Sequence, residues 1–278
     1  TRVPMFSDKG AWFADPKVAE KTRFMHMGLA ADLIAVQHNY SREQLDQLSV
    51  LSHQRALAAI KNGHFDASLV SIKDKNGVAI LSQDNAVRSN VSTGSLAKLP
   101  PAFADAVPLS QHLVSQEYPG TTLEARHSAG NSPALVDGAS LVLLGSKERC
   151  HELGLTPKAR IRHFSNASDN PVKMLTGHIR ATEKLLKATG LKPSDIDLWE
   201  VNESFAASVL LYQESFDISS DRLNIDGSAI SLGHPLGATG GNLLATLVDA
   251  LERENKKLGI VSICGGAGVG TATLVERI

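Results

Sequence analysis

The feature that most constrains this chain is a regular alternation of predicted strands and helices over residues 159–278. Short apolar runs alternate with amphipathic stretches that follow a 3.6-residue period. The predicted strands are residues 159–168, 196–202, 257–264 and 271–278, and the predicted helices are residues 171–190, 203–216 and 237–255. Such alternation predicts a layered α/β domain. The glycine-rich turn between the last two strands predicts an antiparallel hairpin at the edge of the sheet.

The residues before this region show a different pattern, with helices joined by polar loops. Apolar residues recur at helical spacing over 15–39, and Ser41 is a suitable N-cap for a second helix that stops at Gly63. The Asn-Gly pair at 76–77 predicts a turn between two short strands. Residues 140–146, SLVLLGS, form a continuous apolar run, which is typical of a strand buried on both faces of a sheet.

Composition excludes several classes of protein. The 278 residues carry a formal net charge of −1, which gives no overall basic field for nucleic acid or an acidic membrane. No apolar run approaches the roughly 18–20 residues of a membrane-spanning helix. Two cysteines are too few for a disulfide-stapled fold and fit a reducing compartment. We therefore expect a globular chain with a large core.

Three segments place chemically useful residues at turns between predicted elements. Asn202 lies in VNESFA, His234 in GHPLGATGG and Cys264 in CGGAGVG. Active-site groups of α/β folds gather at such turns, because rigid elements hold them while their tips stay accessible. Asn202 can hold a water, His234 can stabilise an oxyanion near a helix N-terminus, and Cys264 can ionise if its pKa is lowered. The alternatives are a helix cap, a structural loop histidine and a buried inert cysteine.

Two phosphate-binding motifs are excluded. GHPLGATGG lacks the Lys and the adjacent Ser or Thr of a P-loop. The glycines at 266, 268 and 270 are followed by only eight residues, which is too few for the helix and the acidic residue of a dinucleotide-binding fingerprint.

Taken together, the three segments resemble the C-terminal half of a thiolase. They read Asn-Glu-x-Phe-Ala at 202–206, Gly-His-Pro-x-Gly-x-x-Gly at 233–240 and Cys-x-Gly-x-Gly at 264–268. The resemblance extends to HMGLAAD at 26–32 and to AGNSPALVDGAS at 129–140.

The resemblance implies an α/β fold of the thiolase type, a layered αβαβα core of two similar halves. This chain would supply the loop domain and the C-terminal half. Residues 1–125 would form a helical loop domain that covers coenzyme A, residues 126–148 the last strand segment of the N-terminal half, and residues 149–278 the C-terminal half. It also implies a homodimer or homotetramer. Whether a hydratase/dehydrogenase partner subunit is bound stays open.

The activity that the resemblance implies is thiolysis of a 3-oxoacyl-CoA by coenzyme A, or the reverse Claisen condensation of acyl-CoA units. Cys264 would be the acid/base. His234 and a water held by Asn202 would form one oxyanion hole, and the backbone N–H of Gly266 would contribute to a second. Each donor aimed at a developing oxyanion can be worth about 10²–10³ in rate.

The same resemblance implies which residues meet the substrate. His26 and Met27 match residues that line the acyl pocket, and Phe205 matches an aromatic residue beside it. Ser128 is expected to contact coenzyme A. Coenzyme A is a substrate here, so no cofactor and no metal are expected.

The sequence departs from the family at its nucleophile. Thiolases use two cysteines, and the one that is acylated lies upstream of anything in this sequence. Cys150, in the charged stretch SKERCHELG, has no glycine turn and no oxyanion donor beside it, so it cannot substitute. We expect these residues to belong to a longer chain and to be inactive alone. The alternatives are a non-catalytic thiolase-like subunit that is structural or binds lipid or coenzyme A, and a ketoacyl synthase relative, which would carry His or Asn in place of Cys264.

Smaller departures are Pro133, where the family has a small hydroxyl residue, and His178, where proline is usual. The C-terminal VERI is no peroxisomal signal, which favours a cytoplasmic location, with the mitochondrial matrix left open. The family points to lipid metabolism and fatty acid β-oxidation. The sequence leaves open the acyl chain length, whether the substrate is a sterol or a fatty-acyl compound, and the physiological direction of the reaction.

Overall fold

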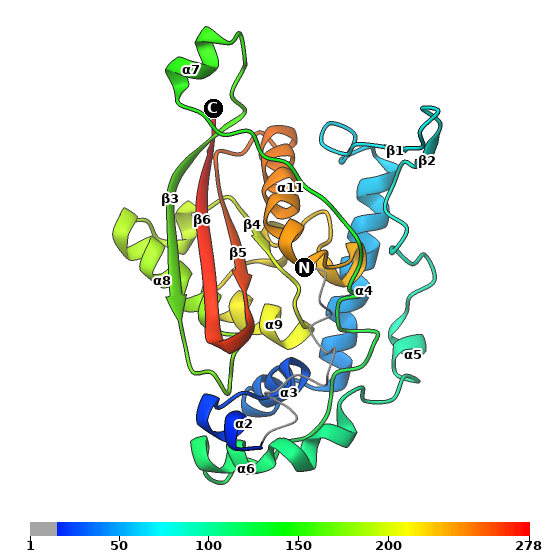
Figure 1. The fold of residues 1–278 in the computed structure, drawn as a ribbon, viewed down its shortest axis with the longest axis vertical. Helices are drawn as coiled ribbons and strands as arrows, with labels where there is room; N and C mark the ends of the chain where they lie inside the picture. Colours follow the sequence, from blue (N-terminus) through cyan, green and yellow to red (C-terminus); the bar gives the residue numbers. More distant parts are fainter. Residues whose placement is uncertain (1–15) are drawn as a thin grey trace.

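A four-stranded mixed sheet forms the centre of the computed structural model, which describes residues 16–278 (Figure 1). Its strands are, in spatial order, β3 (Ala159–Ser168), β6 (Val269–Arg277), β5 (Leu258–Cys264) and β4 (Leu198–Val201). β6 runs antiparallel to both β3 and β5, and β4 runs parallel to β5. The predicted antiparallel hairpin is therefore present, but its expected place at the edge is wrong. Strands from earlier in the chain pair with both of its open sides, which periodicity within the hairpin does not reveal.

Helices cover both faces of this sheet (Figure 1). They are α8 (Gly177–Thr189), α9 (Ala206–Ser215) and α11 (Thr239–Arg253). α8 and α9 share one buried apolar cluster with Ile260 and Cys264 of β5. α11 packs in a second cluster with Val261, whose side chain points to the opposite face because residues alternate along a strand. The predicted layered α/β arrangement is confirmed.

The N-terminal helices differ from the predicted pattern at one place. They are α2 (Pro16–Thr22), α3 (Met27–Gln37), α4 (Arg42–Lys61), α5 (Thr93–Leu96) and α6 (Val107–Glu117). The predicted single helix over 15–39 is interrupted, because Arg23 has a φ of 55° and His26 has an extended backbone. Ser41 caps α4 as predicted, in a reciprocal capping box with Gln44.

Short elements complete the described chain. β1 (Ile72–Lys73) and β2 (Ala79–Leu81) form the predicted hairpin. The remaining helices are α7 (Lys147–Glu152), α10 (Ala229–Leu232) and the 3₁₀ turns η2 (Ala104–Ala106), η3 (Pro193–Asp195), η4 (Ser220–Arg222), η5 (Leu236–Ala238) and η6 (Gly266–Gly268). Within residues 16–278, no helix is both long and apolar enough to cross a bilayer.

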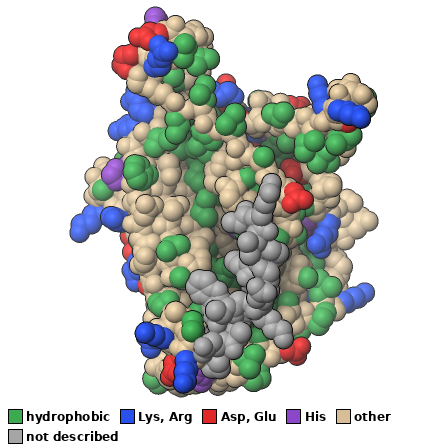
Figure 2. Space-filling view, in the orientation of Figure 1, with side chains coloured by type: hydrophobic (Ala, Val, Ile, Leu, Met, Phe, Trp, Pro, Cys, Tyr) green, Lys and Arg blue, Asp and Glu red, His purple; other side chains and the backbone are tan. Residues whose placement is uncertain are grey.

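The apolar run at 140–146 is not a buried strand in this structure, so that prediction is wrong. The segment lies outside every strand, and the side chains of Leu141 and Leu143 are 97% and 78% exposed. None of the described strands pairs with it. Figure 2 shows hydrophobic side chains, in green, exposed on the face of the molecule that is turned to the viewer. A strand that reads as buried on both faces needs neighbours on both sides, and the described residues do not supply them.

Candidate active site

Two of the predicted site residues lie at the carboxyl ends of adjacent parallel strands. Asn202 follows β4, and Cys264 is the last residue of β5. Val201 lies opposite Ser262 in the parallel register, and the backbone N–H of Asn202 donates to the carbonyl of Ser262 at 2.9 Å. The carboxyl ends of parallel strands meet at one edge of a sheet, where ligands of α/β folds commonly bind. Strand pairing thus brings together two residues that are distant in sequence.

Ser204 connects these two residues. The Asn202 side-chain N–H₂ donates to Ser204 Oγ at 2.8 Å, and Ser204 Oγ lies 3.1 Å from Cys264 Sγ. All three side chains are buried, and Asn202 Oδ1 accepts no hydrogen bond from the described residues. Asn202 does not cap α9, because the N-cap position belongs to Phe205. The helix-cap alternative for Asn202 is therefore wrong.

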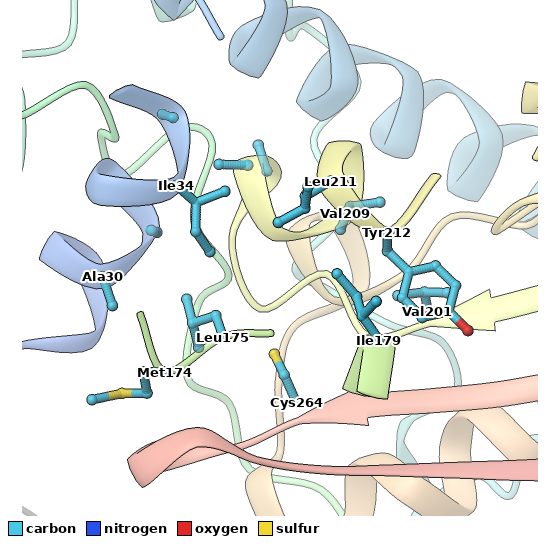
Figure 3. Close-up of a cluster of buried hydrophobic side chains, with 14 of the residues drawn as sticks. Ala30, Ile34, Met174, Leu175, Ile179, Val201, Val209, Leu211, Tyr212 and Cys264 are labelled. Carbon is cyan, nitrogen blue, oxygen red and sulfur yellow. The ribbon is translucent and has the colours of Figure 1, made fainter. Parts of the chain in front are cut away.

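The environment of Cys264 is apolar rather than cationic. Figure 3 shows its sulfur pointing from the end of β5 towards Leu175. Burial raises the pKa of the Cys264 thiol above its ordinary value, and hydrogen bonds with Ser204 and Ser208 oppose this rise. The lowered pKa that would let Cys264 ionise readily is therefore not found, because burial dominates. A thiol of this kind is protonated at neutral pH and suits a general acid.

His234 lies in a separate hydrogen-bond network. Its Nδ1 is 2.7 Å from Thr239 Oγ1, and its backbone N–H donates to the carbonyl of Ala134 at 2.8 Å. Burial lowers the pKa of His234, so the ring is mostly neutral at pH 7. Thr239 begins α11, which covers the sheet face opposite to the Cys264 side chain. The contacts thus join Asn202 to Cys264, and a cavity shared with His234 stays a prediction.

The glycines after Cys264 have different reasons to be glycine. A Cβ on Gly270 would lie 2.0 Å from the backbone N of His178, and a Cβ on Gly268, whose φ is +85°, would lie 2.4 Å from a backbone oxygen. These two glycines pack the turn against the segment that leads into α8. A Cβ on Gly266 would meet nothing within 4 Å. The surface at Gly266 is open, and its role as an oxyanion donor stays a prediction.

Aromatic packing brings together two of the predicted acyl-pocket residues. The ring of His26 lies 4.8 Å from the ring of Phe103, and Phe103 lies 6.0 Å from Phe205 in an edge-to-face contact. His26 also caps α3, where its Nδ1 accepts the N–H of Gly28 at 3.1 Å. Met27 begins the same helix and packs against the core. Their contact with an acyl chain stays a prediction.

Ser128 is held by protein groups. Its buried hydroxyl accepts hydrogen bonds from Arg42 at 3.0 Å and from the backbone N–H of Gly130 at 3.2 Å. This arrangement ties its loop to α4, and its contact with coenzyme A stays a prediction. Cys150 lies in α7 and is partly exposed, and both it and Cys264 are free thiols. The described residues hold no group of three or more His, Cys, Asp or Glu that could bind a metal.

The structure also identifies residues that the sequence did not. Besides Ser204 and Phe103, a fully buried pair joins Asp32 Oδ1 to His127 Nδ1 at 2.7 Å. Because Nδ1 donates to Asp32, His127 Nε2 accepts the N–H of Ala207 at 3.3 Å, which fixes the start of α9. Each of these contacts joins residues sixty or more positions apart, and no local pattern announces it.

Comparison with known proteins gives one consistent result. Family models described as "Thiolase, N-terminal domain" and "Thiolase, C-terminal domain" match residues 9–148 and 155–277. The chain is 39% identical over 258 residues to a 3-ketoacyl-CoA thiolase of Marinobacter nauticus, covering 91% of this chain and 62% of the relative. It is 35% identical over 259 residues to an acetyl-CoA acetyltransferase of Escherichia coli, covering 92% of this chain and 61% of the relative.

A solved structure agrees with these relatives. The crystal structure of the Bacillus anthracis acetyl-CoA acetyltransferase matches with a TM-score of 0.80 at 32% identity, and it covers 91% of this chain and 60% of that one. The chain thus spans about three fifths of the length of the relatives it matches.

Proposed function

The chain belongs to the thiolase family, and from this premise we propose that it forms the loop domain and C-terminal half of a thiolase-type acyltransferase. The proposed reaction is thiolysis of a 3-oxoacyl-CoA by coenzyme A, or the reverse condensation of acyl-CoA units. Coenzyme A enters as a substrate, and the reaction needs no separate cofactor. The names of the relatives, 3-ketoacyl-CoA thiolase and acetyl-CoA acetyltransferase, support this class of reaction.

The observation that carries the proposal is the Asn202–Ser204–Cys264 contact at the carboxyl ends of β4 and β5. In the proposed mechanism Cys264 is the acid/base. As a protonated thiol it delivers its proton to the enolate that carbon–carbon cleavage releases, and as a thiolate it takes the proton of coenzyme A or the α-proton in condensation. The raised pKa of Cys264 supports the acid role, because the thiol is the resting form.

The remaining site residues take the oxyanion roles. The unpartnered Oδ1 of buried Asn202 is free to accept a hydrogen from a water, and that water and His234 would donate to a thioester oxygen. The N–H of Gly266, on an open surface, would serve the second oxyanion hole. Such donors act strongly because they are fixed before the charge develops.

Turnover in this proposal needs a nucleophilic cysteine that the 278 residues do not contain, since Cys150 lies in α7, away from Cys264's cluster. We propose that a segment preceding the region matched here supplies it. The test is to mix the protein with acetoacetyl-CoA and coenzyme A and to follow loss of the 3-oxothioester. We expect turnover from a chain that includes the upstream segment and none from residues 1–278 alone.

The second candidate is a thiolase-like subunit that binds lipid or coenzyme A, or is structural, without catalysis. The missing second site cysteine favours it. No turnover from the longer chain, with retained binding of coenzyme A by calorimetry, would select this candidate. A homodimer or homotetramer, a hydratase/dehydrogenase partner and a cytoplasmic location are further proposals, supported by the family and by bacterial relatives.

A further inference from the structure

Two serine hydroxyls lie near the Cys264 sulfur, and they differ in what their hydrogens do. Ser208 Oγ is 3.8 Å from Sγ, and it donates its own hydrogen to the carbonyl of Leu175 at 3.1 Å. A hydroxyl has one hydrogen and two acceptor lone pairs. Ser208 therefore cannot donate to the sulfur while it keeps the bond to Leu175.

The hydroxyl of Ser204 is free to donate. Its oxygen accepts a hydrogen from the Asn202 side chain at 2.8 Å and, in the resting thiol, a hydrogen from Cys264 Sγ at 3.1 Å. The hydrogen of Ser204 itself is donated to none of the described groups, so it can turn to the sulfur once Cys264 has lost its proton. Hydrogen bonds in such a chain polarise one another, so the Asn202 bond strengthens the donation from Ser204. The distance to sulfur is also shorter than that of Ser208.

We propose that Ser204 is a positioning residue that ties the carboxamide of Asn202 to the sulfur of Cys264 and donates a hydrogen bond to the thiolate whenever Cys264 ionises. Ser204 keeps its own proton throughout. The proton that leaves Cys264 goes to the substrate or to solvent. In Ser204 no bond breaks, and only the direction of the hydroxyl hydrogen changes. The use of this thiolate in an acid/base cycle rests on the proposed function, whereas the effect on the thiol itself does not.

Two consequences follow for this chain. Ser204 opposes the effect of burial, which raises the pKa of Cys264. None of the described charged side chains contributes to that pKa, so only hydrogen bonds oppose burial, and Ser204 makes the largest contribution among them. Of the two hydroxyls, Ser204 is the one whose hydrogen is not held by a carbonyl. Ser204 also fixes the orientation of the Asn202 side chain, because the Ser204 oxygen accepts a hydrogen from the N–H₂ group of Asn202. In this orientation Asn202 Oδ1 has no hydrogen-bond partner among the described residues.

The test measures the thiol without any acyl-CoA. In a Cys150→Ser background, the rate of Cys264 alkylation by iodoacetamide is followed by intact mass from pH 7 to 10, with circular dichroism as a check on folding. A rise of one pKa unit lowers the thiolate fraction about tenfold at a fixed pH. We expect Ser204→Ala to lower the rate at pH 8 at least fivefold. Loss of a side-chain atom opens the site, so reduced access does not explain a fall.

Two matched variants complete the experiment. Ser208→Ala should alkylate within twofold of the parent, and Ser204→Thr, which keeps a hydroxyl, should restore the rate. A Ser204→Ala rate less than fivefold below the parent, or an equal fall in Ser208→Ala, overturns the proposal. This outcome is distinct from that of the turnover assay. If Ser204→Ala leaves the alkylation rate unchanged while the longer chain turns over, the role of Ser204 is refuted and the proposed function is not.

Discussion

The glycine-rich turn after Cys264 allows a paired prediction, because two of its glycines face opposite steric conditions. In Gly270→Ala the new Cβ would lie 2.0 Å from the backbone N of His178 and 2.1 Å from the backbone C of Gly177. Both atoms belong to the backbone at the start of α8 and cannot rotate away. The helix must therefore move from the strand until the contact reaches the ordinary range above 3.4 Å.

The cost of that movement is set by how α8 is held. α8 packs on the sheet through buried side chains that include Ala181 and Leu185, so a shift of its first turn disturbs the larger core cluster. Overpacking a core costs about 1–3 kcal/mol where side chains can adjust. We expect Gly270→Ala to lower the free energy of unfolding by about 3 kcal/mol, at the upper end of that range.

Gly266→Ala is the matched control. Its Cβ would meet nothing within 4 Å, and its φ is not among the positive ones. Reduced freedom of the unfolded chain should then leave stability unchanged or raise it by about 0.4–1 kcal/mol. In a chain that includes the upstream segment, the same methyl group should nevertheless reduce turnover, because it occupies the surface open to substrate.

The assay for this pair is urea denaturation followed by circular dichroism. With a slope of about 1–3 kcal/mol per molar urea, the Gly270→Ala midpoint should fall by at least about 1 M. A Gly270→Ala midpoint equal to that of the parent would refute the steric argument. A loss of similar size in Gly266→Ala would show that the surface at Gly266 is not open.

Three further predictions concern a helix cap, a buried histidine and the site thiol. Ser41→Ala removes one arm of the capping box of α4 and should cost about 1 kcal/mol in urea denaturation, with the exposed Ser68→Ala as a neutral control. Burial lowers the pKa of His178 to about 3, so between pH 6.5 and 3 the unfolded state binds a proton that the folded state does not. The free energy of unfolding should fall by up to about 1.4 kcal/mol per pH unit as pH drops through this window, and His178→Phe, which keeps the stack on Tyr212, should flatten the slope; an unchanged slope would contradict it. Cys264→Ala in a chain that includes the upstream segment should abolish turnover and leave acylation of the upstream cysteine detectable by mass, whereas normal turnover would remove Cys264 from the acid/base role.

The sequence predicted those features that depend on neighbouring residues. Ser41 and Gln44 lie within one turn of each other, so the capping box is visible in the sequence and present in the structure. The predicted strand at 159–168 agrees residue for residue with β3. The helix predicted to begin at 171 starts at Gly177, because Asn170 Oδ1 accepts the backbone N–H of Val172 and holds the chain in a turn first.

Features that depend on residues distant in the sequence could not be predicted from such local patterns. Strand order requires knowing which strand lies beside which, and the sequence shows only that strands exist. The contact of Ser204 with Cys264 arises because β4 and β5 end at the same edge of the sheet. The raised pKa of Cys264 follows from the core that surrounds it, and a glycine-rich motif carries no information about that burial.

The run at 140–146 shows how a correct pattern can give a wrong local structure. Leu141, Leu143 and Leu144 are each more than two-thirds exposed. Burying one such side chain fully contributes about 1.5–3 kcal/mol, so three of them represent an amount comparable with the net stability of about 5–15 kcal/mol of a whole domain. An apolar run of this kind encodes a strand only in the presence of a sheet that pairs with it. The described residues supply no strand that pairs with 140–146, so the run stays exposed.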